Sequence, residues 1–496
     1  MSEILNSEDE PSELNVPEKE GDAFIDAIAK NPDDMAPRLM CADWLQEQGY
    51  ADVGEFMRIQ IELSDLQSDQ DHREKNRQRI SALRRRERKL TKAANDFWQE
   101  RLSRFGVTAI QFKGGMPESV GLRVPDFVEH GQEVFSIAPV SDLRIGICPD
   151  ADVLQEALAE TRQRQLEQLR RLSMVNAHDG GAGVVARCRH LKNLTSLGLH
   201  QGILTEAGIR EIASSKYLKK LTGLELGGNN LGSGGAEVLA RAAAFKNLKN
   251  LSIWGNRIGN LGARALASSK ILRNLTSLNV GSNEIGIEGI EALSNSRTLK
   301  ELTIMDISGN EIGLDGVRVL LEGLMIERLT ELNMSSNPIR PEVAHLIAQS
   351  EKLHKLEKLN IGEALVMGGT GVLELANSTC FGNLTELDMR RVCTILGPKE
   401  MGAIANSANF RSVNRLVLKN NSIRVEGIAE FLKSFNLPNL EELDLSDNFI
   451  GPEGAKLLAK SKALKNLKLL YLTMSGIGPE GLAALKLHLP ECEVIV

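Results

Sequence analysis

One asparagine returns every 27 residues through the middle of this 496-residue chain, and this spacing limits the possible folds more than any other feature. The regularly spaced residues are Asn229, Asn256, Asn283, Asn310 and Asn337. Each stands at the end of the frame apolar-x-x-apolar-x-apolar-x-x-Asn, as in Leu221, Leu224 and Leu226 before Asn229. Eleven copies of the frame begin at Leu194, some with another residue in place of the asparagine. A fixed period of this length predicts stacked structural repeats rather than one globular core.

Each part of the frame has a physical role. The alternating segment around Leu224 and Leu226 predicts a short strand with its apolar side chains inward. The asparagine stands where the chain turns, and its amide can pair with backbone groups that no strand pairs. A Gly-x-x-x-Leu segment follows, as in Gly235 to Leu239, and predicts one face of a short helix. Repetition of strand, turn and helix predicts a parallel inner sheet with outer helices.

This frame resembles the ribonuclease-inhibitor class of leucine-rich repeat, and the resemblance covers about residues 191–496. The resemblance implies an α/β fold: a right-handed solenoid, or horseshoe, preceded here by a small helical domain. It also implies that proteins bind on the concave face, and it names no partner. The composition fits a stacked repeat, because aromatic residues are only 4% of the chain and the core must be aliphatic.

The chain before the repeats divides into four predicted parts. Residues 1–20 are acidic and predict a disordered tail. Residues 21–66 contain Pro37-Arg38-Leu39 and Ala42-Asp43-Trp44-Leu45, which resemble a bacterial repeat-companion domain of helical hairpins. Within it, Trp44 is interpreted either as a core residue or as a ligand platform. Residues 67–104 predict a basic helical linker, and residues 105–190 predict degenerate repeats and an N-terminal cap.

The segment that begins at Arg73 and ends at Lys92 holds ten Lys or Arg and only two acidic residues, Glu74 and Glu87. Its sparse apolar residues predict a long, largely solvated helix. The segment is interpreted as a charged spacer or as a contact for an acidic partner or nucleic acid. The net charge of −7 gives the chain no overall basic field, so nucleic acid is expected to bind weakly here if at all.

The cysteines and the apolar segments of the sequence indicate the cellular compartment of the protein. Six cysteines stand apart, without a Cys-x-x-Cys pair and without a secretory signal before them. We therefore predict reduced thiols in a cytoplasmic protein. No stretch reaches the roughly 18 apolar residues of a membrane span, so no membrane contact is expected.

The sequence motifs predict no enzyme, metal site or cofactor. His178, Asp179, Cys188 and His190 lie close in sequence, but their spacing fits none of the common zinc patterns. The glycines between Gly227 and Gly235 resemble a phosphate loop but lack its Gly-Lys-Ser/Thr ending. Neither a Gly-x-Ser-x-Gly nor a His-Glu-x-x-His motif occurs.

The exposed side of the predicted strands supplies the candidate binding residues. Trp254 and Tyr471 are large aromatics on that side, and each either contacts a partner or packs against a neighbouring side chain. A mixed cluster in the eighth to tenth repeats either steers a partner or forms internal ion pairs: Glu386, Asp388, Arg390, Arg391, Arg415, Lys419, Glu442, Asp444 and Asp447. The predicted partner-binding residues are Trp254, Tyr471, Asp306, Asp388, Arg390, Arg391, Arg415, Lys419 and Asp444.

Two repeats depart from the frame. Ala364 and Val392 stand where asparagine is expected, and the spacing stretches to 28 and then 29 residues. The asparagine ladder should be interrupted there. The departure is interpreted as sequence drift or as a bend or site beside Arg390 and Arg391.

Together these features favour a non-enzymatic scaffold that binds a protein on the concave face. One alternative is an activator of a small GTPase, using an arginine on a repeat-end loop such as Arg257 or Arg424. Another is a structural array that assembles with itself through its solenoid ends.

Overall fold

The computed structural model describes residues 18–67, 76–147, 151–158 and 166–496, which divide into two compact units. Unit 1 comprises the described residues up to Val175 together with Cys188–Leu194. Unit 2 comprises Asn176–Arg187 and Thr195–Val496. No helix in these described ranges is both long and apolar enough to cross a membrane. The predicted acidic tail lies almost wholly outside the described residues.

Unit 1 combines helices with a small sheet. Its helices are α1 (Glu18–Lys30), α2 (Ala36–Glu47), α3 (Ala51–Leu66), α5 (Arg77–Leu102), α6 (Val124–Ile137) and α7 (Ala151–Ala157), with short 3-10 turns η1 (Ser103–Phe105) and η3 (Arg189–Leu191). Its strands are β1 (Ala109–Lys113), β2 (Met116–Leu122), β3 (Asp142–Ile147) and β4 (Arg171–Val175). The strands β1 and β2 form an antiparallel hairpin, and β2, β3 and β4 are parallel neighbours in chain order.

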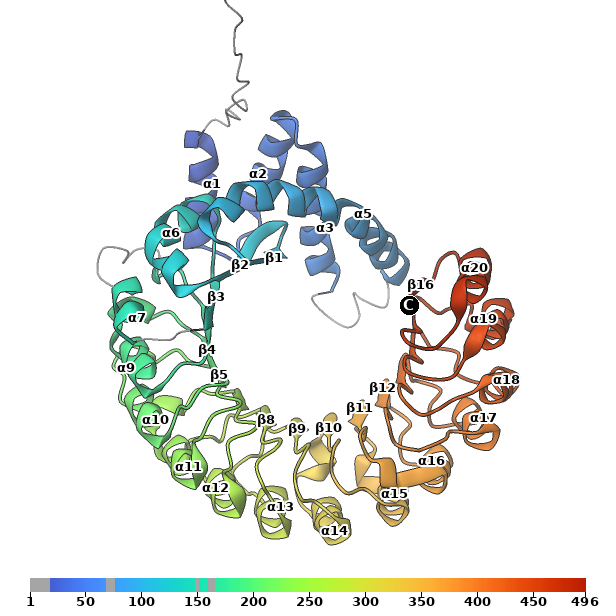
Figure 1. The fold of residues 1–496 in the computed structure, drawn as a ribbon. Coiled ribbons are helices and arrows are strands. Elements are labelled where there is room, and N and C mark those ends of the chain that lie inside the picture. Colours follow the sequence, from blue (N-terminus) through green and yellow to red (C-terminus); the bar gives the residue numbers. More distant parts are fainter. Residues whose placement is uncertain (1–17, 68–75, 148–150, 159–165) are drawn as a thin grey trace, which may run out of the picture. The chain divides into compact units, whose positions relative to one another are not determined.

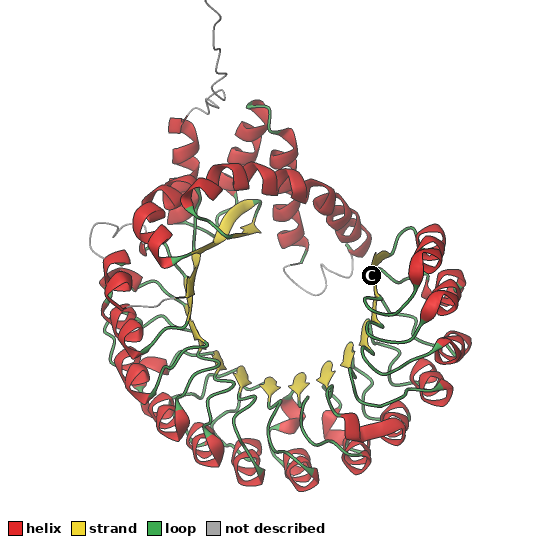
Figure 2. Ribbon diagram, in the orientation of Figure 1, coloured by secondary structure: helices red, strands yellow, loops and turns green. Residues whose placement is uncertain are grey.

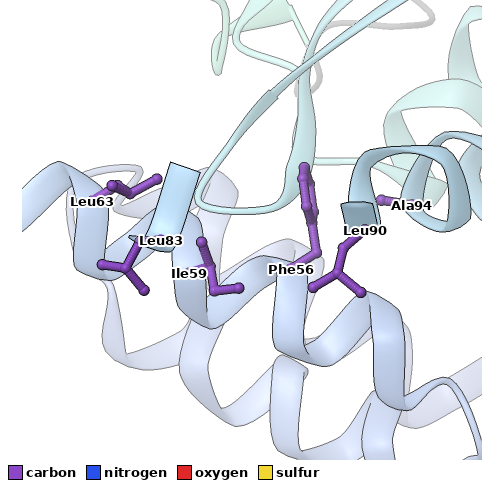
Figure 3. Close-up of a cluster of buried hydrophobic side chains, with 6 residues drawn as sticks. All are labelled: Phe56, Ile59, Leu63, Leu83, Leu90 and Ala94. Carbon is purple, nitrogen blue, oxygen red and sulfur yellow. The ribbon is translucent and has the colours of Figure 1, made fainter. Parts of the chain in front are cut away.

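Apolar residues at helical spacing pack α3 against α5. The buried cluster consists of Phe56, Ile59 and Leu63 of α3 and Leu83, Leu90 and Ala94 of α5 (Figure 3). The helix predicted over the basic segment is thus confirmed from Arg77 onward, while residues 73–75 lie outside the described ranges. Two of its basic residues face α3: Arg79 pairs with Glu62 and Arg86 with Glu55, at 2.7 and 2.6 Å.

The turn of the β1–β2 hairpin is fastened to α2 and α3. The Arg38 side chain is fully buried, and its Nη1 donates a hydrogen bond of 2.9 Å to the carbonyl oxygen of Lys113. Gly115 adopts a φ of +77° and lies so close to Met57 that a Cβ could not fit. Its N–H donates to Oε1 of Gln60 at 2.8 Å. The helices and the hairpin therefore share one core.

Trp44 is half-buried on α2, with its ring 6.1 Å from that of Phe24 on α1. This contact is the packing expected of a core residue.

Unit 2 alternates short strands with helices, and equivalent residues of neighbouring strands pair in parallel register, as Glu225 does with Ser252. Figures 1 and 2 show its strands on the inner side of the curve and its helices on the outer side. The structure confirms the predicted α/β solenoid with a parallel inner sheet. Its strands are β5 (Ser196–His200), β6 (Gly223–Glu225), β7 (Asn250–Ser252), β8 (Ser277–Asn279), β9 (Ile304–Asp306), β10 (Glu331–Asn333), β11 (Lys358–Asn360), β12 (Glu386–Asp388), β13 (Arg415–Val417), β14 (Glu442–Asp444), β15 (Leu469–Tyr471) and β16 (Glu493–Ile495).

The outer side of unit 2 carries α-helices and 3-10 turns. The α-helices are α9 (Asp179–Arg187), α10 (Glu206–Ala213), α11 (Gly232–Arg241), α12 (Gly259–Ala267), α13 (Ile287–Ser294), α14 (Leu314–Glu322), α15 (Pro341–Ala348), α16 (Gly368–Ala376), α17 (Pro398–Asn406), α18 (Val425–Lys433), α19 (Gly451–Lys460) and α20 (Gly478–His488). The turns are η4 (Ala243–Phe245), η5 (Ile326–Arg328), η6 (Glu351–Leu353), η7 (Leu365–Met367) and η8 (Lys462–Leu464).

Buried asparagine side chains join successive repeats. In Asn283, the amide nitrogen donates to the carbonyl oxygen of Ile253, and the amide oxygen accepts from the N–H of Asn256, both at 2.9 Å. The same arrangement returns at Asn421 and Asn448. Between these two parts of the ladder stand the buried side chains of Ala364 and Val392, which have no amide, so the ladder is interrupted as expected.

Candidate functional site

Four positions in each repeat of unit 2 lie at the inner side of the curve. They are the two residues that flank the buried leucine of the strand, the residue two further on, and the turn residue after that. In the repeat of β6 these are Gly223, Glu225, Gly227 and Gly228. The parallel register places equivalent residues of neighbouring repeats side by side. We call this set of positions, from β5 to β16, the concave sheet.

Acidic side chains outnumber basic ones on the concave sheet. Its carboxylates belong to Glu225, Asp306, Glu331, Glu363, Glu386, Asp388, Glu442, Asp444, Asp447 and Glu493. Its Lys and Arg side chains are Lys358, Arg390, Arg391, Arg415 and Lys419. The sheet therefore carries a net negative charge.

Every one of these basic side chains already has an acidic partner. Lys358 lies between Glu331 and Glu386, with Nζ to carboxylate distances of 3.1 and 3.4 Å. Arg390 folds back on Asp388, with Nε 2.9 Å from Oδ2. The hydrogen bonds to Asp388 raise the pKa of the Arg390 guanidinium.

The remaining three pairs join neighbouring repeats: Arg391 to Glu363 at 3.0 Å, Arg415 to Glu442 at 2.8 Å, and Lys419 to Asp447 at 3.0 Å. Partly exposed ion pairs of this kind contribute at most about 1 kcal/mol each to stability. Their main effect here is to occupy the basic side chains of the face.

The structure brings most of the predicted site residues together on β12, β13, β14 and the turns after them: Asp388, Arg390, Arg391, Arg415, Lys419 and Asp444. Their internal ion pairs correspond to the second interpretation of this cluster. The Asp388 side chain is buried, and its carboxylate is bonded to Arg390. Asp444 accepts a hydrogen bond of 2.9 Å from the N–H of Ser446.

Other predicted site residues stand apart from this cluster. Asp306 accepts from the hydroxyl of Ser308 and from the Asn333 amide. Tyr471 is half-buried on β15, and burial raises the pKa of its hydroxyl. Trp254 follows β7, eight strands from the β15 strand of Tyr471. At about 4.8 Å per strand this separation is roughly 40 Å along the sheet.

The indole of Trp254 lies across the preceding repeat and is 37% exposed. A Cβ added to Gly227 would stand 1.9 Å from its Nε1, and one on Gly228 would stand 3.3 Å from its Cη2. The two glycines therefore leave the space that the ring fills. Glu225 points to the same side two residues before Gly227, which places its Cβ about 7 Å from the edge of the ring.

Glu225 is the charged neighbour of this indole. Its side chain is 50% exposed. Its one ion-pair contact within the described part of the chain is with His200, 3.5 Å away, which is charged only when protonated. Glu225 stands between the buried Leu224 and Leu226, so strand alternation puts it on the inner side, but it is not among the predicted partner-binding residues. The missed signal is a Gly-Gly pair one repeat before a tryptophan.

Two of the four residues that could imitate a metal cluster, Asp179 and His190, contact other parts of the protein. Asp179 caps the next helix by accepting from the N–H groups of Thr205 and Gly208, at 2.8 and 3.0 Å. His190 contacts Glu167 at 3.4 Å. Throughout the described ranges, no group of three or more His, Cys, Asp or Glu side chains is placed to hold a metal ion.

The arginines considered for a GTPase contact lie on repeat-end turns. Arg257 is exposed and adopts a φ of +53°, with a loose 4.0 Å contact to Glu284. Arg424 is the residue before α18.

A surface groove of about 630 Å³ lies beside the irregular repeats. It is lined by residues of α16, α17 and α18 and the loops after them, including Gly402 and Asn406. It does not include Arg390 or Arg391, beside which the irregular spacing suggested a site.

The family described as "Leucine Rich repeat" matches residues 217–240, 272–294, 295–321 and 436–459. No curated protein matches the chain in sequence. Among solved structures, an internalin from Listeria monocytogenes is 19% identical over 70% of this chain and 93% of its own, with a TM-score of 0.38. A structure of the yeast Rad7 and Elc1 complex is 18% identical over 69% of this chain and 86% of its own, with a TM-score of 0.46. A leucine-rich repeat protein of Leptospira interrogans is 19% identical over 73% of this chain and 91% of its own, with a TM-score of 0.34.

The repeat frame, the parallel sheet and the family match lead to one conclusion. The repeating array of unit 2 is built of leucine-rich repeats, and the chain is a leucine-rich repeat protein.

Proposed function

We propose that this chain is a non-enzymatic scaffold of the ribonuclease-inhibitor-like class that binds another protein on the concave sheet. The observation that carries the proposal is the exposed indole of Trp254, which lies over Gly227 and Gly228; we call these two residues the glycine floor. Large aromatic side chains are enriched among the residues that dominate binding energy. A ring already held in place loses little conformational freedom when a partner covers it.

The rest of the chain supports this scaffold in the proposal. Residues 21–66 act as the repeat-companion domain, and residues 105–190 supply the degenerate repeats and the N-terminal cap. Within unit 1, Arg38 and Met57 pack on the turn of the β1–β2 hairpin. The free thiols of Cys41, Cys380 and Cys393 are buried, which agrees with a reducing, cytoplasmic setting.

The experiment compares partner capture by the intact protein, by Trp254→Ala and by Tyr217→Ala, with bound proteins cross-linked and identified by mass spectrometry. Tyr217 is a matched control, because it is also 37% exposed but lies between α10 and β6, outside the concave sheet. We expect Trp254→Ala to lose the partner and Tyr217→Ala to keep it, with cross-links on concave-sheet residues.

A partner that Trp254→Ala still retains, or cross-links confined to the outer helices, would exclude the concave sheet as the binding face. Light scattering of each variant over a range of protein concentrations identifies self-assembly directly. If the molecular mass of the protein rises with its concentration and the assembled protein no longer binds the partner, the structural array is favoured instead.

A further inference from the structure

We propose that the partner segment bound by the concave sheet is basic, and that one of its Lys or Arg side chains rests on the Trp254 indole with its charge toward Glu225. This inference rests on the proposed concave-face binding and specifies the chemistry of the partner.

The charge of the face is the first support. The basic side chains of the concave sheet are all held by carboxylates of the same sheet. An incoming acidic segment would have to break one of these pairs to find a cation. A basic segment finds carboxylates already available, because Glu225, Asp306 and Asp444 form no ion pair with Lys or Arg in the described part of the chain.

The arrangement around Trp254 is the second support. The glycines Gly227 and Gly228 let the indole lie against the sheet, which leaves part of the ring open to solvent. Lys and Arg cations are attracted to the face of such a ring within about 6 Å of its centre. Glu225 stands on the adjacent strand, about 7 Å away, so one extended guanidinium or ammonium side chain can reach both groups.

The Trp254 indole and the Glu225 carboxylate also bind different parts of one Lys or Arg side chain. The indole accepts the apolar stem and the delocalised charge, and the carboxylate accepts its N–H groups. An aliphatic residue would use the indole alone and leave Glu225 facing an apolar surface. An acidic residue would be repelled by Glu225. The pair therefore selects a long basic side chain.

The test uses fluorescence anisotropy with the full chain and two labelled probe peptides. One probe repeats Gly-Arg-Ser, and the other has Glu in place of each Arg. The variants are Trp254→Ala, Glu225→Gln and Glu237→Gln, each checked for native circular dichroism. Glu237 is the matched control, because its side chain is 49% exposed on the outer helix α11 and its change alters the net charge equally.

We expect the Arg peptide to bind and the Glu peptide not to bind. Trp254→Ala should weaken binding about tenfold, and Glu225→Gln up to about fivefold. Glu237→Gln should leave the affinity unchanged. Binding should weaken as the ionic strength rises to about 0.15 M, where the Debye length is about 8 Å.

Equal losses in Glu225→Gln and Glu237→Gln would show attraction to overall charge only and would overturn the inference. Preferential binding of the Glu peptide would do the same. The proposed function is tested separately. A captured partner whose binding depends on Trp254 but whose bound segment is acidic or apolar would refute the basic segment and leave the proposed function standing. A partner that is indifferent to Trp254 refutes both.

Discussion

Replacing Asn310 by alanine removes a side chain that joins neighbouring repeats at buried backbone groups. The Asn310 amide nitrogen donates to the carbonyl oxygens of Val280 and Ile307, at 3.1 and 3.0 Å. Its amide oxygen accepts from the N–H groups of Asn283 and Ile285, both at 3.0 Å. A net hydrogen bond contributes about 1 kcal/mol, and a buried donor left unpaired costs about 1–3 kcal/mol. We therefore expect Asn310→Ala to lower the free energy of unfolding by about 4 kcal/mol.

The matched control for this change is Asn360→Ala. Asn360 is half-buried on the concave sheet, and its side-chain oxygen accepts a hydrogen bond of 2.9 Å from the N–H of Gly362. Its loss should cost about 1 kcal/mol or less. Urea unfolding followed by circular dichroism measures both variants, and hydrogen exchange at Asn283 and Ile285 locates the effect. Similar losses in the two variants would refute the idea that the asparagine ladder holds the repeats together.

Three further predictions concern single side chains. Arg38→Ala should lower the stability to urea by about 3 kcal/mol, because it empties a fully buried site and frees the Lys113 carbonyl; a loss below about 1 kcal/mol would contradict this role. Gly227→Ala should push the Trp254 indole off the sheet, seen as stronger acrylamide quenching of that residue with unchanged circular dichroism; unchanged quenching would contradict the glycine floor. Burial raises the pKa of the Cys41 thiol to about 12, so its reactive thiolate is scarce at about pH 8. Iodoacetamide should therefore modify Cys41 only in urea, which mass spectrometry would show. Rapid modification of Cys41 in the folded chain would contradict its burial.

The sequence predicted the repeats well because their physical requirement is periodic. Leu224, Leu251 and Leu278 are buried on neighbouring strands in the order that the frame implies. The interruption at Ala364 and Val392 followed from the same frame. Each of these positions is fixed by its own repeat and the next, so local spacing carries the information.

Other ladders escaped notice although they obey nearly the same period. Ser269 and Ser296 each donate a hydroxyl hydrogen bond of 2.5 Å to a carbonyl oxygen at the end of the helix in the preceding repeat. Asn247 and Asn274 donate to backbone carbonyls one repeat earlier. Small polar residues are common in loops, so their spacing gives a weaker signal than buried leucines do.

The binding face was harder to predict, because strand alternation shows which side a residue faces and not what it touches. The alternation placed Arg390 and Trp254 correctly at the inner side of the curve. It could not show that Arg390 folds back on Asp388, or that Trp254 lies across Gly227. Such contacts depend on side-chain rotamers and on residues one repeat away. The fixation of Lys113 by the distant Arg38 is a long-range contact of the same kind.

The gap in the asparagine ladder has a consequence for how unit 2 loses its structure. Each repeat of a solenoid contacts only its neighbours, so cooperativity passes along the chain one interface at a time. The ladder couples the repeats from Asn229 to Asn337 and again from Asn421 to Asn448, but Ala364 and Val392 supply no such coupling between them. Unit 2 should therefore unfold as two cooperative blocks, and the strand that precedes Trp254 belongs to the first. Opening at the second block would leave the Trp254 surface intact.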